Sequence, residues 1–222
     1  MYKQPIFSHT KNNNYHGFSF ERSKNMSISL NNSETKQNLM RAFAGESQAR
    51  NRYTFAAEAA GEQKLYGLER LFLFTAEQER AHAKVFFDFL EECNDQNILI
   101  DAKYPVNVGN SMAYQLSVAH RNEYEEYEQI YPLFAQIAKE EGFPLIAHAF
   151  EKIAKIEKVH GDTFQKYAHL LEKGLLFHEP TNSSFICLNC GYIFEGTDVP
   201  ERCPVCQHEQ GYFVRVQDAP FH

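Results

Sequence analysis

The chain has 222 residues, of which 43% are hydrophobic, and its formal net charge is −7 at pH 7. This length and apolar content suit one medium domain with a hydrophobic core and one small domain, and they exclude a fibrous or broadly disordered chain. The acidic balance argues against a nucleic-acid-binding surface, and no apolar stretch is long enough to span a bilayer.

Residues 1–33 are rich in asparagine and serine and show no apolar periodicity. This composition predicts a disordered N-terminal extension, because such a segment cannot bury itself. Basic residues outnumber the single acid of the segment, Glu21. An organellar presequence is therefore a weaker alternative to an inert extension.

Two apolar stripes at three- and four-residue spacing predict the first pair of helices. The first helix should begin at a capping residue, Asn32 or Ser33, and end near Gly61. The second should cover residues 65–92. The pattern then lapses over residues 93–110, and a connection of that length suits a crossover between two helix pairs.

The second pair of helices follows the crossover. A stripe from 112 to 137 predicts the third helix, and Pro132 within it predicts a kink or brief break near Tyr131. Gly142 and Pro144 mark a stop and a new start, and the fourth helix should end near Gly174. The helical domain is thus predicted to span residues 34–174 as a four-helix bundle.

Carboxylates and imidazoles interrupt every one of these apolar stripes. The interrupting residues are Glu46, Glu79, His82, Glu123, Glu126, Glu157 and His160. A buried acid without a partner costs several kcal/mol or stays protonated, so acids at five stripe positions require compensation. Residues three apart on a helix lie about 4.5 Å apart along its axis, so each such pair can present two ligands to one region.

The ligand set predicts two metal ions. Two divalent cations offset four of the five carboxylate charges, whereas one cation would leave three uncompensated. Mixed carboxylate and imidazole ligation favours iron or manganese over calcium or structural zinc. We favour iron, because its redox chemistry gives a second metal site a purpose.

The pattern is doubled, since Glu46 precedes Glu79 by 33 residues and Glu123 precedes Glu157 by 34. A single Glu-x-x-His pair is more often an exposed helix face than a ligand pair, but two copies in phase with apolar stripes favour metal ligands. Glu126 has no counterpart in the first half. It is therefore predicted to be an asymmetric ligand that lets one metal change partners.

Four of the five cysteines form two Cys-x-x-Cys pairs near the C-terminus: Cys187, Cys190, Cys203 and Cys206. This spacing predicts a tetrahedral metal site, either a zinc ribbon or a one-iron site. Short strands are expected at 185–187, 191–194 and 212–216, in a domain spanning 184–217 between a linker (175–183) and a tail (218–222). No secretory segment accompanies the cysteines, so the cytoplasm is the default compartment.

Several motifs in order resemble the rubrerythrin family: AFAGESQARNRYTF, EQERAHAKVFF, NEYEEYEQIYPLF, and CLNCGY with CPVC. The resemblance covers about residues 34–216. It implies a mainly α protein with a ferritin-like four-helix bundle and a long crossover, followed by a small rubredoxin-like β domain. All seven bundle residues match family ligands, and His82 matches the residue that trades places with the Glu126 equivalent. Tyr53 and Tyr131 match tyrosines that hydrogen-bond ligand carboxylates, although a role as ordinary core tyrosines remains open.

The resemblance also implies a function. It predicts a non-heme peroxidase that reduces hydrogen peroxide to water at a di-iron centre, with electrons relayed through one iron held by four cysteines. The electrons would come indirectly from NAD(P)H through a redox partner protein, and the chain would form a homodimer or higher homo-oligomer. The alternatives are a di-iron oxidase or ferroxidase that acts on oxygen and ferrous iron, an iron store, and a zinc-ribbon interaction module.

Overall fold

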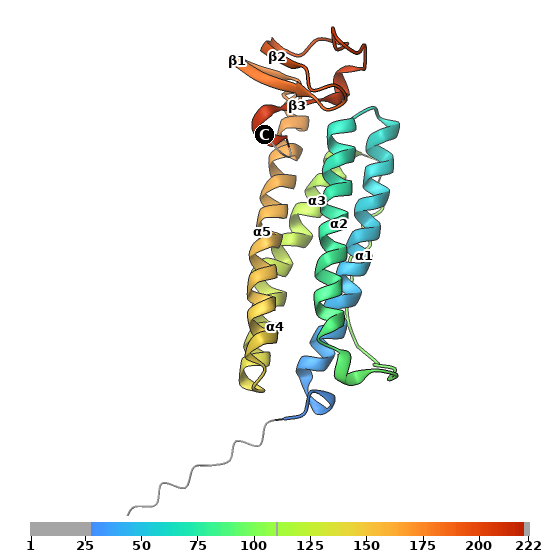
Figure 1. Cartoon of the computed structure of the whole chain (residues 1–222), viewed down its shortest axis with the longest axis vertical. Coiled ribbons are helices and arrows are strands. Elements are labelled where there is room, and N and C mark those ends of the chain that lie inside the picture. Colours follow the sequence, from blue (N-terminus) through green and yellow to red (C-terminus); the bar gives the residue numbers. More distant parts are fainter. Residues whose placement is uncertain (1–27, 110, 220–222) are drawn as a thin grey trace, which may run out of the picture.

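The computed structural model describes residues 28–109 and 111–219. A bundle of long helices stands end to end with a small β domain (Figure 1). The helices are α1 (Glu34–Glu62), α2 (Tyr66–Asp88), α3 (Met112–Glu125), α4 (Tyr131–Glu140) and α5 (Pro144–Glu172). None of the described helices is both long and apolar enough to cross a membrane.

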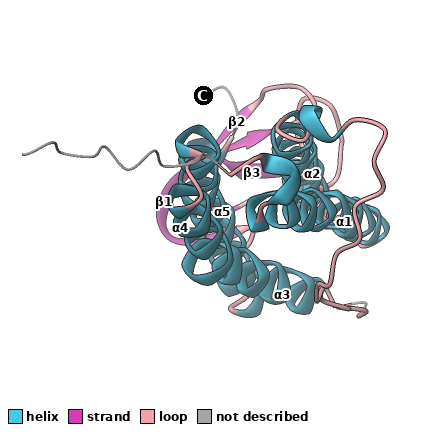
Figure 2. Ribbon diagram, turned by 90° about the horizontal axis from the view of Figure 1, so that it is seen from below, coloured by secondary structure: helices cyan, strands magenta, loops and turns pink. Residues whose placement is uncertain are grey.

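The bundle consists of two helix hairpins. Helix α1 packs along α2, and α5 packs along α3 and α4, whereas contacts between the hairpins are sparser. Figure 2, viewed along the bundle, shows the two hairpins side by side. The segment that joins them runs from the short 3-10 helix Glu91–Cys93 to Ser111 and contains no other helix or strand among its described residues. The predicted four-helix bundle with a long crossover is confirmed.

Helices α3 and α4 form one continuous rod joined by a π-helical turn, Glu126–Ile130. The backbone N–H of Tyr131 donates to the carbonyl of Glu126, five residues earlier. Pro132 follows in the first turn of α4, where its missing N–H costs little. The interruption predicted near Tyr131 is therefore a change of hydrogen-bond register that ends at this residue, and the helix does not break.

Two apolar clusters fill the bundle, one toward each end. The cluster nearer the β domain contains aromatic side chains such as Phe72 and Phe164, and the cluster at the other end contains Phe86 and Phe150. On each helical rod, the ionisable residues that interrupt the stripe lie between the positions that belong to the two clusters. The acids and histidines therefore form a layer across the middle of the bundle.

The C-terminal domain is a three-stranded antiparallel sheet with strand order β2-β1-β3. Its strands are β1 (His178–Cys187), β2 (Ile193–Asp198) and β3 (Phe213–Arg215). The linker predicted for 175–183 is wrong from His178 onward, because β1 begins at this residue, which pairs with Asp198 of β2. The alternation that marks a strand is weak there, since these residues are polar and only partly buried.

The β domain is fixed to the end of its own bundle. An ideal Cβ at Gly211 would lie 1.8 Å from the carbonyl oxygen of Lys64, so the two backbones meet without space for a side chain. The rings of Tyr66 and Tyr212 lie 4.2 Å apart between centroids, and Arg70 donates to the carbonyl of Leu188 at 2.9 Å. These contacts tie the α1–α2 turn and the start of α2 to the cysteine module.

Two further boundaries differ from the prediction. The extension predicted for 1–33 does not reach Ser33, because Leu30–Asn32 forms a 3-10 helix and the side chain of Leu30 packs into the cluster at the far end of the bundle. Residues 1–27 lie outside the described part of the chain. The predicted tail at 218–222 is also partly ordered, since Lys166 binds the carboxylate of Asp218 and Ala219 is buried.

The first turn of α1 is capped from two directions. Ser33 accepts a hydrogen bond from the N–H of Lys36 at 3.0 Å, as expected for an N-cap. The carboxylate of Glu141 accepts the N–H groups of Glu34 and Thr35 at 2.9 and 2.8 Å, and also the Thr35 hydroxyl. Glu141, at the turn between α4 and α5, thus joins the second hairpin to the start of the first.

We predict that Glu141→Gln destabilises the protein by about 1 kcal/mol near neutral pH. Burial raises the pKa of Glu141, but the hydrogen bonds from Thr35 and Glu34 outweigh it and leave the pKa below its usual value. The contribution is therefore present above the unfolded-state pKa of about 4.3 and is lost as the pH falls through the lower folded-state pKa.

Denaturant unfolding measured between pH 3 and 7 checks this prediction. The control is Glu140→Gln on the same helix end, which removes an exposed charge near the α4 C-terminus but leaves α1 capped. A loss for Glu141→Gln that equals the control, or that does not shrink at low pH, would contradict the capping role.

Candidate metal centre

The ionisable layer of the bundle contains two overlapping groups of metal-ligand atoms. One group is Glu46, Glu79, His82 and Glu157, and the other is Glu79, Glu123, Glu157 and His160. Within each group the ligand atoms all lie within 4.8 Å of one another, and all of these residues are buried. Glu79 and Glu157 belong to both groups, which is the arrangement expected of carboxylates that bridge two ions.

The two histidines face the acids through their Nδ1 atoms. His82 Nδ1 lies 3.0 Å from Glu157 Oε1 and 3.3 Å from Glu79 Oε2. His160 Nδ1 lies 2.8 Å from Glu157 Oε2 and 3.1 Å from Glu79 Oε1. The imidazole rings are nearly parallel, with centroids 5.8 Å apart. Each ring thus supplies one ligand atom to one side of the shared acids.

Burial makes this layer electrostatically costly. Burial, together with the neighbouring acids, raises the pKa of Glu46 well above its usual value and that of Glu123 to about 8. The pKa of Glu79 is instead low, because its close contacts with the two imidazoles outweigh its burial. Burial lowers the pKa of His82, but the carboxylates that its ring faces, first among them Glu157, outweigh burial and raise the pKa to about 12. Cations therefore belong in this layer.

The orphaned atoms of the layer fit metal ions. Although these side chains face one another closely, six of their buried ligand atoms make no hydrogen bond of suitable geometry with any described residue: Glu46 Oε2, Glu79 Oε1, Glu123 Oε2, both carboxylate oxygens of Glu157, and His160 Nδ1. Buried polar atoms in proteins are nearly always satisfied. Since the six atoms all come from the predicted ligands and converge on one region, two divalent cations would satisfy them together.

Two tyrosines hold carboxylates of the layer from outside it. Tyr53 donates its hydroxyl to Glu123, and Tyr131 donates to Glu46. Both tyrosines are buried, and burial raises the pKa of each well above its usual value, so each stays a hydrogen-bond donor. Their predicted positions are thus matched by contacts across the bundle, which orient one oxygen of each acid and leave the other free.

Glu126 lies in neither group of ligand atoms. It starts the π-helical turn, its side chain is half-buried, and it lines a cavity beside the layer. Burial and the charges of Glu46 and Glu123 raise its pKa well above the usual value. Its carboxylate is thus close enough to interact electrostatically with the acids of the layer, whereas His82 belongs to the ligand group that contains Glu46. Its role as an exchangeable ligand stays a prediction.

Two residues of the site escaped the sequence analysis. Gln78 contacts His160 Nε2 through its Oε1 at 3.0 Å, which fixes the ring opposite the ligand nitrogen. Gly161 allows α3 to approach α5, since an ideal Cβ there would lie 2.6 Å from the ring of Tyr124 and 3.3 Å from Glu123 Cβ. Neither position interrupts an apolar stripe with charge, so only their adjacency to Glu79 and His160 could have indicated them.

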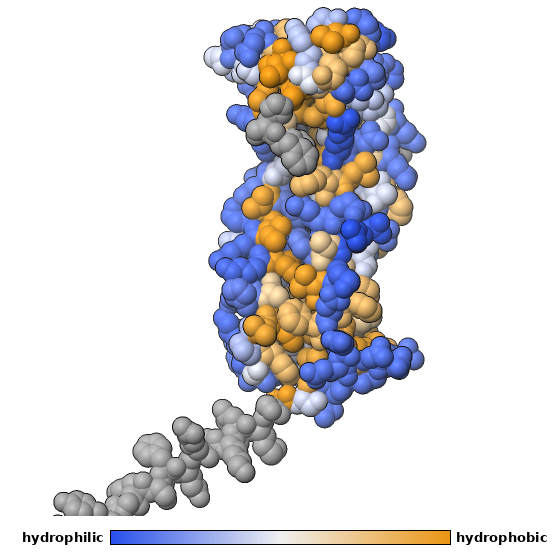
Figure 3. All heavy atoms as spheres, in the orientation of Figure 1, coloured by the Kyte–Doolittle hydropathy of each residue, from blue (hydrophilic) through white to orange (hydrophobic). Residues whose placement is uncertain are grey.

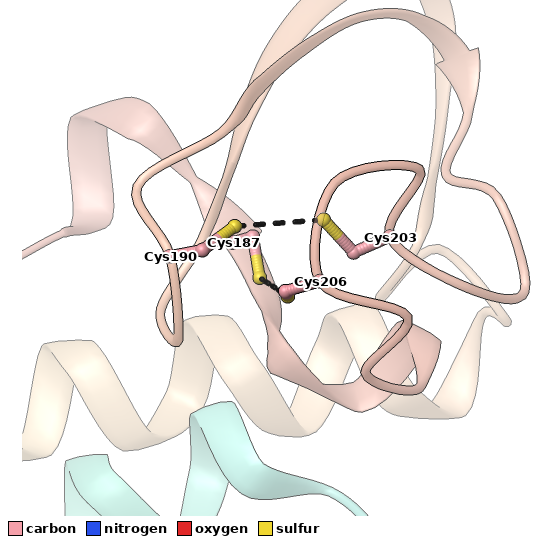
Figure 4. Close-up of side chains that lie close together, drawn as sticks. All are labelled: Cys187, Cys190, Cys203 and Cys206. Carbon is pink, nitrogen blue, oxygen red and sulfur yellow. Dashed lines mark hydrogen bonds between the residues drawn. The ribbon is translucent and has the colours of Figure 1, made fainter.

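The four cysteines of the β domain form the second candidate site. They lie in one group, with Cys187 Sγ 3.7 Å from Cys206 Sγ and Cys190 Sγ 3.6 Å from Cys203 Sγ (Figure 4). Cys187 and Cys203 are buried, Cys190 is exposed, and Cys206 lies between these extremes. All four are free thiols at distances that suit a common tetrahedral ion.

Backbone N–H groups lie close to these thiols and lower the pKa of one of them. Burial raises the pKa of Cys187, although the nearby N–H groups of Cys190 and Asn189 act in the opposite direction. A hydrogen bond from the N–H of His208 lowers the pKa of Cys206 to about 6. Because metal ions bind the thiolate, Cys206 is the thiol whose low pKa favours loading of the site.

Comparisons with known proteins match both parts of the chain. Residues 37–168 match the family model described as rubrerythrin, and residues 185–214 match the one described as the rubredoxin-like domain of rubrerythrin. The rubrerythrin of Clostridium perfringens is 41% identical over 83% of this chain and 95% of its own length. That of Porphyromonas gingivalis is 40% identical over 88% and 96%, respectively.

Solved structures agree with the observed architecture. The fully reduced, all-ferrous state of nigerythrin is 27% identical with a TM-score of 0.56, and the match covers 88% of this chain and 91% of that one. A bacterioferritin of Mycobacterium tuberculosis is 19% identical with a TM-score of 0.55 over 63% of this chain and 87% of its own. The latter match shows the ferritin-like fold alone.

We predict that Glu79→Ala and Glu157→Ala each abolish binding of two metal ions in the bundle, because each acid contributes to both ligand groups. The cysteine site should stay loaded. The measurement is metal content per chain together with the visible spectrum of the thiolate site. Glu77→Ala is the matched control, since Glu77 lies on the same helix with its side chain 58% exposed. Full bundle loading in either ligand variant would show that the site is misplaced.

Proposed function

The chain belongs to the rubrerythrin family, and from this premise we propose that it is a peroxidase that reduces hydrogen peroxide to water at a di-iron centre in the bundle. Family membership makes it an oxidoreductase; the choice of peroxide is our proposal. The observation that carries it is one chain with two metal sites of different kinds: a buried carboxylate and histidine centre, and a four-thiolate site with one exposed cysteine.

The two sites suit the two halves of such a reaction. A pair of ferrous ions, when bound, supplies two electrons to an O–O bond. The shared acids Glu79 and Glu157 would hold both ions, and the two tyrosine hydroxyls fix one oxygen of Glu46 and of Glu123. Apolar clusters on both sides of the layer exclude bulk water along the bundle axis. One iron in the cysteine site would return electrons singly.

We further propose the context of the reaction. The electrons come indirectly from NAD(P)H through a redox partner protein that approaches the exposed Cys190, and the protein works as a homodimer or higher homo-oligomer in the cytoplasm. The exposure of this thiol supports electron uptake at the surface of the β domain.

An oxidase or ferroxidase that uses oxygen is the nearest rival, because it needs the same bundle ligands. Iron storage fits less well. The bacterioferritin match covers 63% of this chain, whereas the rubrerythrin family models match both the bundle and the cysteine domain. A pure zinc-ribbon module would leave the buried layer without a task.

We predict that the anaerobically reduced, iron-loaded protein is reoxidised by one equivalent of peroxide at least about tenfold faster than by oxygen. Stopped-flow absorbance of the iron–thiolate bands measures both rates. Equal rates, or a faster reaction with oxygen, would sink the peroxidase assignment and favour the oxidase.

We predict that Cys190→Ala interrupts electron transfer from the cysteine site to the bundle site. Steady-state peroxide reduction with an external electron donor should fall by about 100-fold or more, because the relay is broken. A single turnover of the pre-reduced bundle should still proceed. Cys93→Ala is the control, since this buried cysteine lies in the 3-10 helix after α2, at the other end of the bundle from the β domain. Unchanged steady-state turnover in Cys190→Ala would refute the relay.

A further inference from the structure

We propose that a cavity beside the bundle layer is the route by which peroxide reaches the metal centre, and that Gly45 sets the size of the hydroperoxide that can pass. The inference rests on the proposed peroxidase function and adds a specificity determinant to the same site.

The cavity has a volume of about 350 Å³ and lies between α1, the crossover and the π-helical turn. Its lining includes Glu126 and Tyr131, and Tyr131 donates its hydroxyl to Glu46 of the metal layer. The cavity wall therefore includes a tyrosine that is hydrogen-bonded directly to the predicted ligand Glu46. The crossover contributes Tyr104 and Pro105.

Gly45 stands between the crossover and Glu126. An ideal Cβ at Gly45 would lie 3.7 Å from Tyr104 Cε1 and 4.0 Å from Glu126 Oε1, both ordinary van der Waals distances. An alanine would therefore fit, and it would favour the helix by about 1 kcal/mol over glycine. Since neither backbone angle nor packing among the described residues requires a glycine here, what it provides is open space in front of Glu126.

The outer boundary of this space is fixed. The Tyr104 hydroxyl donates to the carbonyl of Arg41 at 2.8 Å, which holds the ring against α1. Polar side chains line the passage as well, among them Gln48, Arg52 and Asn122. A polar oxidant can thus stay hydrogen-bonded on its way in.

The volume exceeds what hydrogen peroxide needs, because a water molecule takes about 30 Å³. A hydroperoxide ROOH accepts two electrons and two protons and gives ROH and water, so any substituent leaves the electron count of the reaction unchanged. The protein's own reductant supplies those electrons through the thiolate site. Steric access past Gly45 and Tyr104 then decides which hydroperoxides react.

The test compares hydrogen peroxide with cumene hydroperoxide in the full-length, iron-loaded protein. Gly45→Val should lower kcat/KM for cumene hydroperoxide relative to that for hydrogen peroxide by about tenfold or more, as expected for filled space in a pocket. Tyr104→Ala should shift the same ratio the other way. A second readout is the rate at which azide binds the oxidised centre, followed by visible absorption, which should slow in Gly45→Val and rise in Tyr104→Ala.

Two control variants make the outcome decisive. Gly61→Ala changes the other glycine of α1, away from the cavity, and should leave the ratio and the azide rate unchanged. Val159→Phe narrows a separate cavity of about 480 Å³ that is lined by Gln78 and His160. If Val159→Phe changes the ratio and Gly45→Val does not, the route lies there and the inference is overturned. Iron content and melting temperature exclude misfolding.

The wild-type protein separates this inference from the proposed function. If it reduces neither hydroperoxide, the peroxidase proposal fails. If it reduces hydrogen peroxide but Gly45→Val and Tyr104→Ala leave both the ratio and the azide rate unchanged, only the access route is wrong.

Discussion

The structure depends on one constraint, which is that a layer of acids and histidines lies buried between two apolar clusters. Aromatic rings close the layer from both sides: Phe72 stacks on Phe164 at 5.2 Å, and Phe86 stacks on Phe150 at 4.8 Å. Water cannot solvate charges in such a place, so the acids need cations or protons. Metal binding and bundle stability are therefore linked, and packing at the two ends determines where the ions lie.

The two halves of the bundle differ by one residue in the spacing between the first acid and its tyrosine. Tyr53 follows Glu46 by seven residues, whereas Tyr131 follows Glu123 by eight, and yet each tyrosine donates to the acid of the other half. The π-helical turn between Glu123 and Tyr131 takes up the extra residue, as π-bulges at functional sites commonly do. The asymmetry seen in the sequence as an extra acid, Glu126, thus coincides with an asymmetry of the backbone.

The sequence was informative where burial and charge conflict. Acids within apolar stripes identified the layer, and Cys-x-x-Cys spacing identified the thiolate group, because few structures tolerate such residues otherwise. Sequence patterns did not predict the features that involve no buried charge. The strand from His178 is polar and half-exposed, the π turn has an ordinary composition, and Gly161 acts only through a contact with Tyr124 on another helix. Tertiary contact decides these features, and no local pattern records it.

The position of the β domain sets the distance that the proposed electron relay would have to cover. The domain meets its own bundle through a backbone contact at Gly211. The buried guanidinium of Arg215 also donates to the carbonyls of Leu175 and Leu176, which follow the C-terminal end of α5 in the chain. These contacts hold the domain at the end of the bundle, beyond the metal layer. Glu79 lies nine residues beyond Arg70 on α2, or about 14 Å along the helix axis. Helix length sets that separation, and the relay proposed above would depend on what approaches the exposed thiol of the domain. Figure 3 shows apolar residues along the face where α2 and α5 line a groove.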